Sequence, residues 1–124
     1  MEPLILKGTE DTPSITLDIT SKQFEISGRS LPEDVVTFYQ PVLDWINLYS
    51  EKPEEEMIWK IRLEYFNTAS SKIILDILMA LEEIKDKGTN VIVQWHFDKN
   101  DNDMMEAGEE YKDLVGLTFE LMGY

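Results

Sequence analysis

The chain contains no cysteine among its 124 residues, and it has only one histidine. The absence of cysteine excludes disulfide bonds, thiolate catalysis and cysteine-ligated metal sites, and it fits a protein of the cytoplasm. The six glycines are scattered singly, so there is no glycine-rich loop of the kind that cradles phosphate groups. With so few groups suited to catalysis or metal binding, we expect no enzyme activity, no catalytic residues, no metal and no cofactor.

Basic residues are scarce as well. The sequence has 11 Lys and Arg residues against 25 Asp and Glu residues, which gives a net charge of −14 at pH 7. Such a chain repels the phosphate groups of nucleic acids and anionic membranes, so neither is an expected partner. No segment is long and apolar enough to span a bilayer, and the opening residues lack the features of a signal peptide. These features predict a cytoplasmic location.

The most informative stretch passes from a predicted strand directly into a predicted helix. Between Met57 and Tyr65 every second residue is apolar, with Lys60, Arg62 and Glu64 on the other parity, which is the pattern of a strand with one buried side. From Ile73 to Ile84 the apolar residues recur with the period of an amphipathic helix. Gly88 stands where a glycine commonly ends a helix.

Similar patterns along the chain predict three strands, followed by a helix, a strand, a helix, a strand, a helix and a last strand. Residues 15–19 and 24–27 form a predicted hairpin after a short first strand at 4–7. Nearly every strand alternates, which is typical of a sheet covered on one face only, and strands joined by helices should run parallel. We therefore predict one domain over residues 1–124, a two-layer α/β sandwich with a mixed β-sheet and helices packed on one face.

Two further helices have recognisable starts. Ser30, followed by Pro32 and Glu33, matches a capping box, so we expect Ser30 to be the N-cap of the first helix. The third helix is predicted over roughly 101–114. It is expected to bury four side chains on one stripe, namely Met104, Ala107, Tyr111 and Leu114.

The segment before the third helix partly matches a calcium-binding loop. Asp98, Asn100, Asn102 and Glu109 occupy positions 1, 3, 5 and 12 of the EF-hand pattern. Position 6 is Asp103 where the pattern requires glycine, and a predicted strand precedes the loop where an EF-hand has a helix. We interpret the segment as an acidic turn whose Asp side chains favour the dipole of the following helix.

The turn between the central strand and the central helix is rich in side-chain oxygen atoms. It contains Asn67, Thr68, Ser70 and Ser71, and Lys72 follows. One interpretation is helix capping, in which Asn67 or Thr68 accepts an N–H bond while Ser70 and Ser71 stay solvated. The other is a phosphoacceptor site, because a phosphoryl group there would meet free N–H groups and the positive end of the helix dipole.

The central helix has more apolar surface than one contact with a sheet requires. Besides the main stripe, Leu75 and Met79 lie on another side, so its first turns are apolar nearly all round. The excess indicates a second contact, either with a partner protein or with a neighbouring helix.

Four segments carry a resemblance to a known family: LILKGTEDTPSITLD, FEISGRSLPEDV, LEYFNTASSKIILDIL and MMEAGEEY. The order of the predicted elements resembles the STAS domain of anti-sigma-factor antagonists. The segments themselves resemble the SiaC-type family, which comprises single-domain, STAS-like regulators. This resemblance covers essentially the whole chain, and its most specific part runs from Leu63 to Lys72.

The resemblance implies a phosphorylation switch. In this family the threonine after the asparagine is the phosphoacceptor, which corresponds to Thr68. The unphosphorylated form binds and activates a diguanylate cyclase, a dedicated Ser/Thr protein kinase abolishes that binding, and a PP2C-type phosphatase restores it. The turn and the helix after it, with Leu75 and Met79, would form the docking face. Asn67 departs from the Asp-Ser-x-Gly motif of other STAS domains, which argues against a direct sigma-factor role.

We therefore predict a cytoplasmic, non-enzymatic phosphoswitch protein that acts in c-di-GMP signalling and biofilm control. An anti-sigma-factor antagonist, which would bind a kinase that also sequesters a sigma factor, is the alternative within this class. A rival from another class is a ligand-binding or catalytic module on the polar face of the sheet. That module would use Lys60, Arg62, Glu64 and His96.

Overall fold

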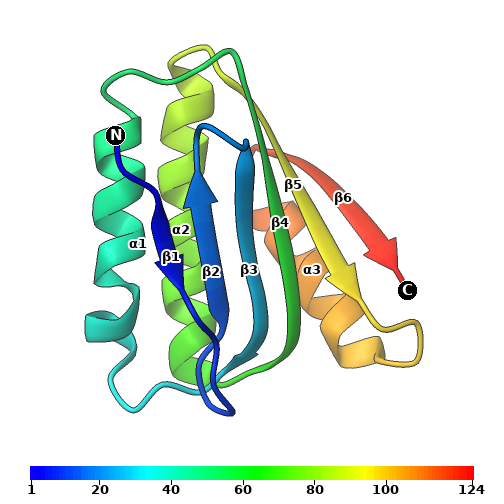
Figure 1. The fold of residues 1–124 in the computed structure, drawn as a ribbon. Coiled ribbons are helices and arrows are strands. Elements are labelled where there is room, and N and C mark those ends of the chain that lie inside the picture. The colour runs from blue at the N-terminus through cyan, green and yellow to red at the C-terminus, as the bar shows by residue number, and fades with distance from the viewer.

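The computed structural model describes all residues from 1 to 124. An initial run of three strands is followed by helices and strands in alternation (Figure 1). The strands are β1 (Leu4–Leu6), β2 (Ser14–Asp18), β3 (Gln23–Ser30), β4 (Glu56–Phe66), β5 (Asn90–Phe97) and β6 (Thr118–Gly123). The helices are α1 (Val35–Tyr49), α2 (Thr68–Asp86) and α3 (Asn102–Leu114). The predicted order of elements is confirmed.

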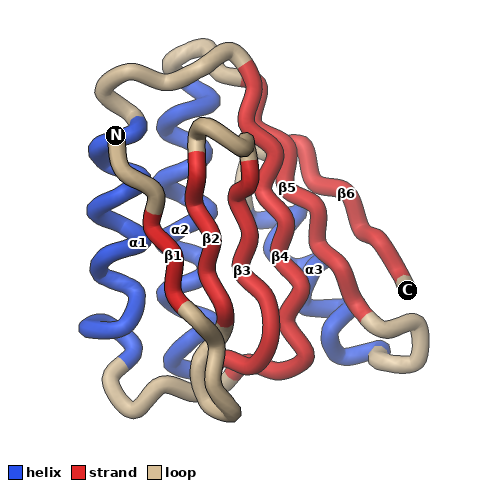
Figure 2. The backbone as a smooth tube through the Cα atoms, viewed as in Figure 1, coloured by secondary structure: helices blue, strands red, loops and turns tan.

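The strands form one six-stranded sheet in the order β1-β2-β3-β4-β5-β6. The first three strands pair antiparallel, whereas β3, β4, β5 and β6 run parallel to one another. All three helices lie on the same side of the sheet, with α1 and α2 behind its N-terminal half and α3 behind its C-terminal half (Figures 1 and 2). The predicted α/β fold, with a mixed sheet covered on one face, is confirmed.

Alternation along β4 places every second side chain against the helices. The buried residues of this strand are Met57, Trp59, Ile61 and Leu63. The alternation was expected to continue to Tyr65, but that side chain is 47% exposed, and Phe66 packs instead near Trp95 and Tyr111. The pairing of β3 with β4 shifts register between Gly28 and Arg29, opposite this part of β4. Such an irregularity bends and twists a strand and redirects its side chains, so the prediction for Tyr65 is wrong.

Helix α1 begins later than the sequence predicts. Ser30 is the last residue of β3 and is paired with Phe66 of β4, so it cannot cap a helix. The N-cap is Asp34, whose Oδ1 accepts the N–H of Thr37 at 3.1 Å. The predicted capping box is therefore wrong, because pairing with β4 keeps Ser30 in the sheet. The side chains that the helix buries against the sheet and α2 are Tyr39, Val42, Trp45, Ile46 and Tyr49.

Helix α3 packs closely on β5. Its N-cap is Asp101, whose Oδ1 accepts the N–H of Met104 at 3.0 Å, as expected for an acidic turn at a helix start. A Cβ atom at Gly108 would lie 2.5 Å from Trp95 Cδ1, so glycine allows the helix to approach the strand. Leu114, which was predicted to be buried, is 65% exposed, because the helix ends there and the following residue, Val115, turns inward. None of the three helices is both long and apolar enough to cross a membrane.

Candidate functional site

The hydroxyl-rich turn lies where β4 ends and α2 begins. Asn67 is the N-cap of α2, in an extended conformation, and its Oδ1 accepts the N–H of Ser70 at 2.9 Å. Of the two capping candidates named from the sequence, the structure therefore selects Asn67. Thr68 is the first residue of the helix and is exposed.

Ser70 does not lie in solvent, as the sequence suggested. It is fully buried, and its Oγ donates a hydrogen bond to the backbone carbonyl of Ser30 at 3.0 Å. The prediction that Ser70 is solvated is wrong, because the first turn of α2 packs against the end of β3 and against α1. Ser71 is half-buried, and its Oγ donates to the backbone carbonyl of Thr68 at 2.6 Å. Of these three hydroxyl residues, Thr68 is therefore the exposed one.

Two buried tyrosines reach the same turn from the neighbouring helices. The hydroxyl of Tyr39, in α1, lies 2.6 Å from Ser30 Oγ, and Ser30 Oγ donates to Ser70 Oγ at 2.8 Å. Tyr111, in α3, donates to the backbone carbonyl of Ser71 at 2.8 Å. The sequence alone predicted no role at this turn for Ser30, Tyr39 or Tyr111. The signal that could have found them is that a buried tyrosine on an apolar stripe usually needs a partner for its hydroxyl.

The outward side of α2 continues from Thr68 along the helix. Lys72 is exposed, and Met79 is 51% exposed although it is apolar. Leu75 is half-buried and packs against the core. Ser71, one turn before Leu75, contacts α3 through Tyr111, so Leu75 lies at the margin between the outward side of α2 and the side that faces α3. Part of the apolar excess is therefore covered by the core, and Met79 remains uncovered.

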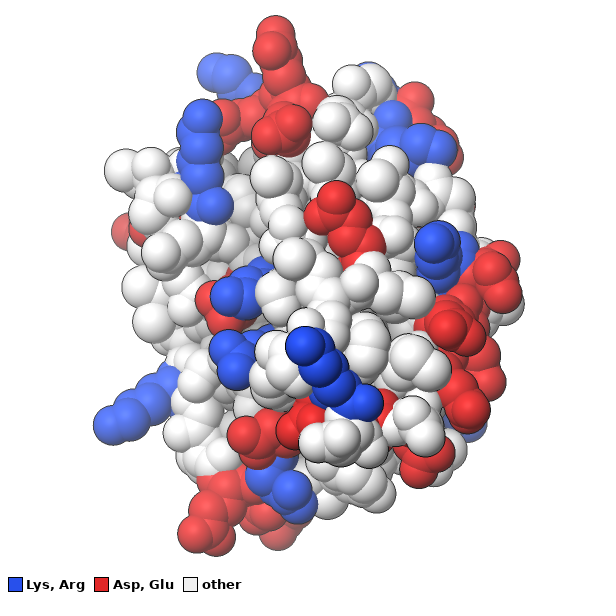
Figure 3. Space-filling view, turned by 90° about the vertical axis from the view of Figure 1, so that its right-hand side faces the viewer, with Lys and Arg blue, Asp and Glu red and all other residues white.

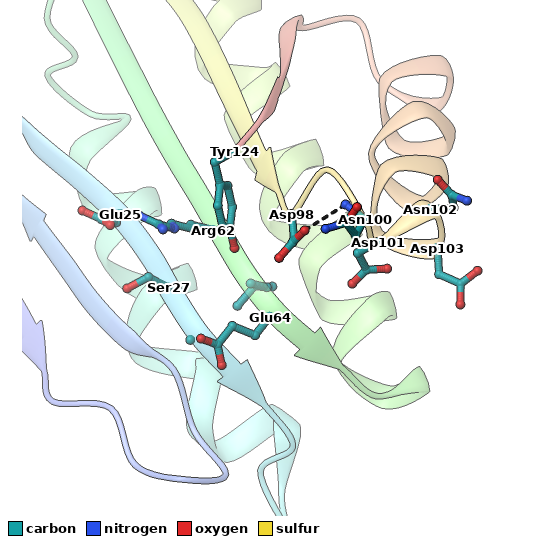
Figure 4. A pocket seen from close by; sticks show the side chains of 12 residues that line it. Glu25, Ser27, Arg62, Glu64, Asp98, Asn100, Asp101, Asn102, Asp103 and Tyr124 are labelled. Atoms are coloured by element: carbon teal, nitrogen blue, oxygen red, sulfur yellow. Dashed lines mark hydrogen bonds between the residues drawn. The ribbon is translucent and has the colours of Figure 1, made fainter.

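The uncovered face of the sheet carries a broad polar cavity of about 890 Å³. Arg62 and Glu64 line it, together with Asp98 and Tyr124, at the carboxyl ends of the parallel strands (Figure 4). The Arg62 guanidinium stacks on the Tyr124 ring, 4.2 Å from the ring centroid. Lys60, the second cation predicted for a site on this face, is not part of the lining.

His96 also lies on this face but outside the cavity lining. Burial, and then the positive charges of Lys60 and Arg62, hold the pKa of His96 below its usual range. The side chain is therefore neutral at pH 7, and its Nε2 is buried without a hydrogen-bond partner. A general base must come within hydrogen-bond reach of the proton that it abstracts, and this nitrogen is buried. The structure thus brings together only part of the predicted ligand-binding set.

Negative charge is concentrated around α3. Figure 3 shows acidic side chains gathered along one margin and at the lower end of the side formed by β6 and α3. Exposed residues of α3 that contribute are Asp103, Glu106, Glu109, Glu110 and Asp113. No group of three or more His, Asp or Glu side chains has the arrangement to hold a metal ion. In the partial EF-hand match, Asp98 instead accepts the N–H of Asn100 at 2.8 Å within the turn.

Fold and site together place the chain among small α/β regulatory domains with an exposed threonine at a strand-to-helix turn. The chain belongs to the SiaC family of regulatory phosphoproteins, whose family model matches residues 6–124. This confirms the family resemblance found in the sequence.

Solved structures of SiaC and a curated relative are similar to this chain over nearly its whole length. The crystal structure of apo-SiaC from Pseudomonas aeruginosa is 30% identical in sequence, with a TM-score of 0.90 over 98% of this chain and 99% of that chain. The crystal structure of the diguanylate cyclase SiaD in complex with its activator SiaC, from the same organism, matches at 30% identity with a TM-score of 0.91, over 98% of this chain and 99% of that chain. The uncharacterized protein PA14_02130 of P. aeruginosa strain UCBPP-PA14 is 30% identical over 100% of this chain and 98% of its own length.

Proposed function

We propose that this protein is a non-enzymatic partner-switching regulator whose phosphoacceptor is Thr68. The unphosphorylated form binds and activates a diguanylate cyclase, by analogy with SiaC of P. aeruginosa, which is the activator of the cyclase SiaD. A Ser/Thr kinase transfers the γ-phosphoryl group of ATP to Thr68 Oγ1. The new O–P bond replaces the bond to the β-phosphate, ADP leaves, and the hydroxyl proton passes to a base of the kinase. A PP2C-type phosphatase returns Thr68 to its hydroxyl form by hydrolysis.

The observation that carries this proposal is the difference between the three hydroxyl groups of the turn. A kinase must bring the acceptor oxygen into line with the γ-phosphate, so the acceptor has to be accessible. Thr68 is exposed, whereas Ser70 is fully buried and the Ser71 hydroxyl is bonded to the backbone carbonyl of Thr68. Thr68 can therefore accept a phosphoryl group without rearrangement of the turn.

The docking face that we propose continues from Thr68 along the outward side of α2. Its members are Thr68, Lys72, Leu75 and Met79, which recur at spacings of three and four residues. With a rise of about 1.5 Å per residue, the Cα atom of Leu75 lies roughly 10 Å along the axis from that of Thr68, and the Cα atom of Met79 roughly 16 Å. A partner that covers Met79 and Leu75 would therefore also come close to the Thr68 hydroxyl.

In the proposed mechanism, phosphorylation of Thr68 destabilises the complex with the partner and leaves the conformation of the free protein unchanged. In the free protein, the phosphoryl group would be solvated and would lie at the positive end of the α2 dipole, so the free form needs no rearrangement. In the complex, a group with a charge of about −1.5 to −2 would have to lose part of its solvation. A tenfold loss of affinity requires a penalty of only about 1.4 kcal/mol.

The test combines phosphosite mapping with binding measurements. The purified protein is incubated with ATP and Ser/Thr kinases of its own organism, and fragment-ion mass spectrometry locates the phosphoryl group. Binding of a diguanylate cyclase from that organism is then measured for the unphosphorylated wild type, Thr68→Ala and Thr68→Asp. We expect one phosphoryl group on Thr68, retained binding for Thr68→Ala, and at least tenfold weaker binding for Thr68→Asp. Ser71→Ala serves as the control and should still accept the phosphoryl group on Thr68. Phosphorylation on Ser70 or Ser71 in the wild type would disprove the assignment of Thr68.

A further inference from the structure

Three buried hydroxyl groups form a chain beneath the turn that carries Thr68. Tyr39 in α1, Ser30 at the end of β3 and Ser70 in α2 each have an exposed fraction of 0%. The Tyr39 hydroxyl lies 2.6 Å from Ser30 Oγ, and Ser30 Oγ lies 2.8 Å from Ser70 Oγ. The hydroxyls therefore connect α1, the sheet and α2 at one point.

The direction of each hydrogen bond in this chain follows from the number of protons available. Ser70 Oγ donates its one proton to the backbone carbonyl of Ser30, and Ser30 Oγ donates its proton to Ser70 Oγ. Tyr39 must then be the donor to Ser30 Oγ, because the Ser30 hydroxyl has no second proton. Every hydroxyl of the chain donates once, so none of these buried groups is left without a partner for its proton.

The end of the chain holds the residues on both sides of Thr68. The backbone carbonyl of Ser30 accepts the N–H of Asn67 at 3.1 Å as well as the Ser70 hydroxyl at 3.0 Å. Asn67 and Ser70 are also bonded to each other through Asn67 Oδ1. One carbonyl oxygen of β3 thus fixes the positions before and after the exposed pair Thr68 and Ala69.

We infer that Ser30 and Tyr39 are positioning residues that hold the first turn of α2 in the form in which Thr68 is presented to its kinase. The inference rests on the proposed function of Thr68 as the phosphoacceptor. Neither residue contacts solvent, so neither can touch the kinase directly. Their effect passes through Ser70 and Asn67. A looser turn would have to be ordered again whenever the kinase binds it, and this would lower kcat/KM for phosphorylation.

The test compares two tyrosines of the same helix. Tyr39→Phe removes the hydroxyl that begins the chain. Tyr49→Phe is the matched control, because Tyr49 is also buried in α1 and its hydroxyl also makes a hydrogen bond, but with the N–H of Glu54. Ten residues of helix, about 15 Å, separate the two positions. Ser30→Ala is the second test variant, which removes the middle hydroxyl from the sheet side.

Two measurements are made on the full chain, after urea denaturation has given the global stability of each variant. The first is amide hydrogen exchange of Asn67, Ser70 and Ser71, which needs no kinase. In Tyr39→Phe and Ser30→Ala we expect these amides to exchange roughly threefold to tenfold faster than in wild type, the effect of losing about one hydrogen bond. In Tyr49→Phe they should exchange at the wild-type rate. Equal exchange in all variants would overturn the inference.

The second measurement is kcat/KM for phosphorylation of Thr68 by the kinase that modifies the wild type. We expect a threefold to tenfold decrease in Tyr39→Phe and Ser30→Ala and none in Tyr49→Phe. A kcat/KM at or above the wild-type value in Tyr39→Phe would overturn the positioning role, even with Thr68 established as the acceptor. Phosphorylation of the wild type at another residue would disprove the proposed function instead, and the exchange data would still decide whether the chain holds the turn.

Discussion

Tyr111 of α3 donates a hydrogen bond from its phenol to the backbone carbonyl of Ser71 in α2, with 2.8 Å between the two oxygen atoms. Ser71 belongs to the first turn of α2, so the third helix is tied to the segment that carries Thr68. The first helix reaches the same turn through Tyr39 and Ser30. Since both neighbouring helices anchor the turn, substitutions on its exposed side should change binding without unfolding the protein.

The two residues at the start of α2 should differ in their effect on stability. Asn67→Ala should lower the free energy of unfolding by about 1 kcal/mol, because it removes the side-chain oxygen that accepts the N–H of Ser70. Thr68→Ala should lower it by less than about 0.5 kcal/mol, since Thr68 is exposed and is not the N-cap. Urea denaturation followed by circular dichroism measures both values. Equal losses for the two variants would show that the Thr68 hydroxyl has a structural role.

The two apolar residues of the proposed docking face should respond differently to a charge. Met79→Asp should weaken binding of the cyclase at least tenfold with little loss of stability, because the Met79 side chain is largely exposed. Leu75→Asp should weaken binding and also lower stability, because Leu75 packs against the core. Binding is measured by isothermal titration calorimetry, and stability by urea denaturation.

Leu48→Asp is the matched control for Met79→Asp. Leu48 is 54% exposed on α1, so the substitution adds the same charge to another helix. We expect it to bind the cyclase as the wild type does. If Met79→Asp and Leu48→Asp weakened binding equally, the effect would come from net charge, and the outward side of α2 would not be the docking face.

Much of the fold could be predicted from the sequence because its signals are local. Alternation located β4, and the period of the apolar residues located α2. The errors arose where pairing with a segment distant in sequence decides the local conformation. The capping pattern at Ser30 is local, but the pairing of Ser30 with Phe66 overrides it. Likewise, pairing with β3 decides which side Tyr65 takes: Gly28 pairs with Leu63 and Arg29 with Tyr65, so Glu64 is an extra residue in β4.

In the candidate site, too, local features could be predicted from the sequence and features set by tertiary packing could not. The hydroxyl-rich turn and the capping role of Asn67 follow from residue types at a strand-to-helix boundary. The burial of Ser70 does not, because serine in a first helical turn is solvated unless another element covers it. Here Ser30 and Tyr39 cover it, and both are distant in sequence. The sequence could therefore indicate the turn, while tertiary packing decides which hydroxyl is exposed.

Gly108 should be essential for the packing of α3 on the sheet. Gly108→Ala should lower the free energy of unfolding by about 1–3 kcal/mol, because the added methyl group would meet the Trp95 ring within the core. Gly123→Ala is the control, since the nearest atom to its Cβ would be Cγ of the flexible, exposed Lys99 side chain, at 3.2 Å. Thermal unfolding with tryptophan fluorescence measures both. Equal losses of stability in the two variants would mean that the contact between Gly108 and Trp95 does not limit how closely α3 packs on the sheet.

The buried tyrosines should make the protein lose stability at alkaline pH. Burial raises the pKa of Tyr39 to about 12, and burial, with a smaller effect of the Glu110 charge, raises the pKa of Tyr111 above its usual range. In the unfolded chain both phenols ionise near pH 10. Folding therefore favours the neutral phenols, and this stabilisation is complete below pH 10 and is lost as the pH rises through the folded-state pKa. The loss reaches at most about 1.4 kcal/mol per pH unit for each tyrosine.

Tyr39→Phe should remove one of these contributions. We expect its free energy of unfolding, measured by urea denaturation between pH 9 and pH 11.5, to decline less steeply above pH 10 than that of the wild type. The variant cannot ionise at this position, so the folded and unfolded chains no longer differ in proton binding there. Tyr65→Phe is the control, because Tyr65 is exposed, and its curve should run parallel to that of the wild type. Parallel curves for wild type and Tyr39→Phe would show that Tyr39 ionises equally in the folded and unfolded chains, and the buried hydroxyl chain would then be open to water.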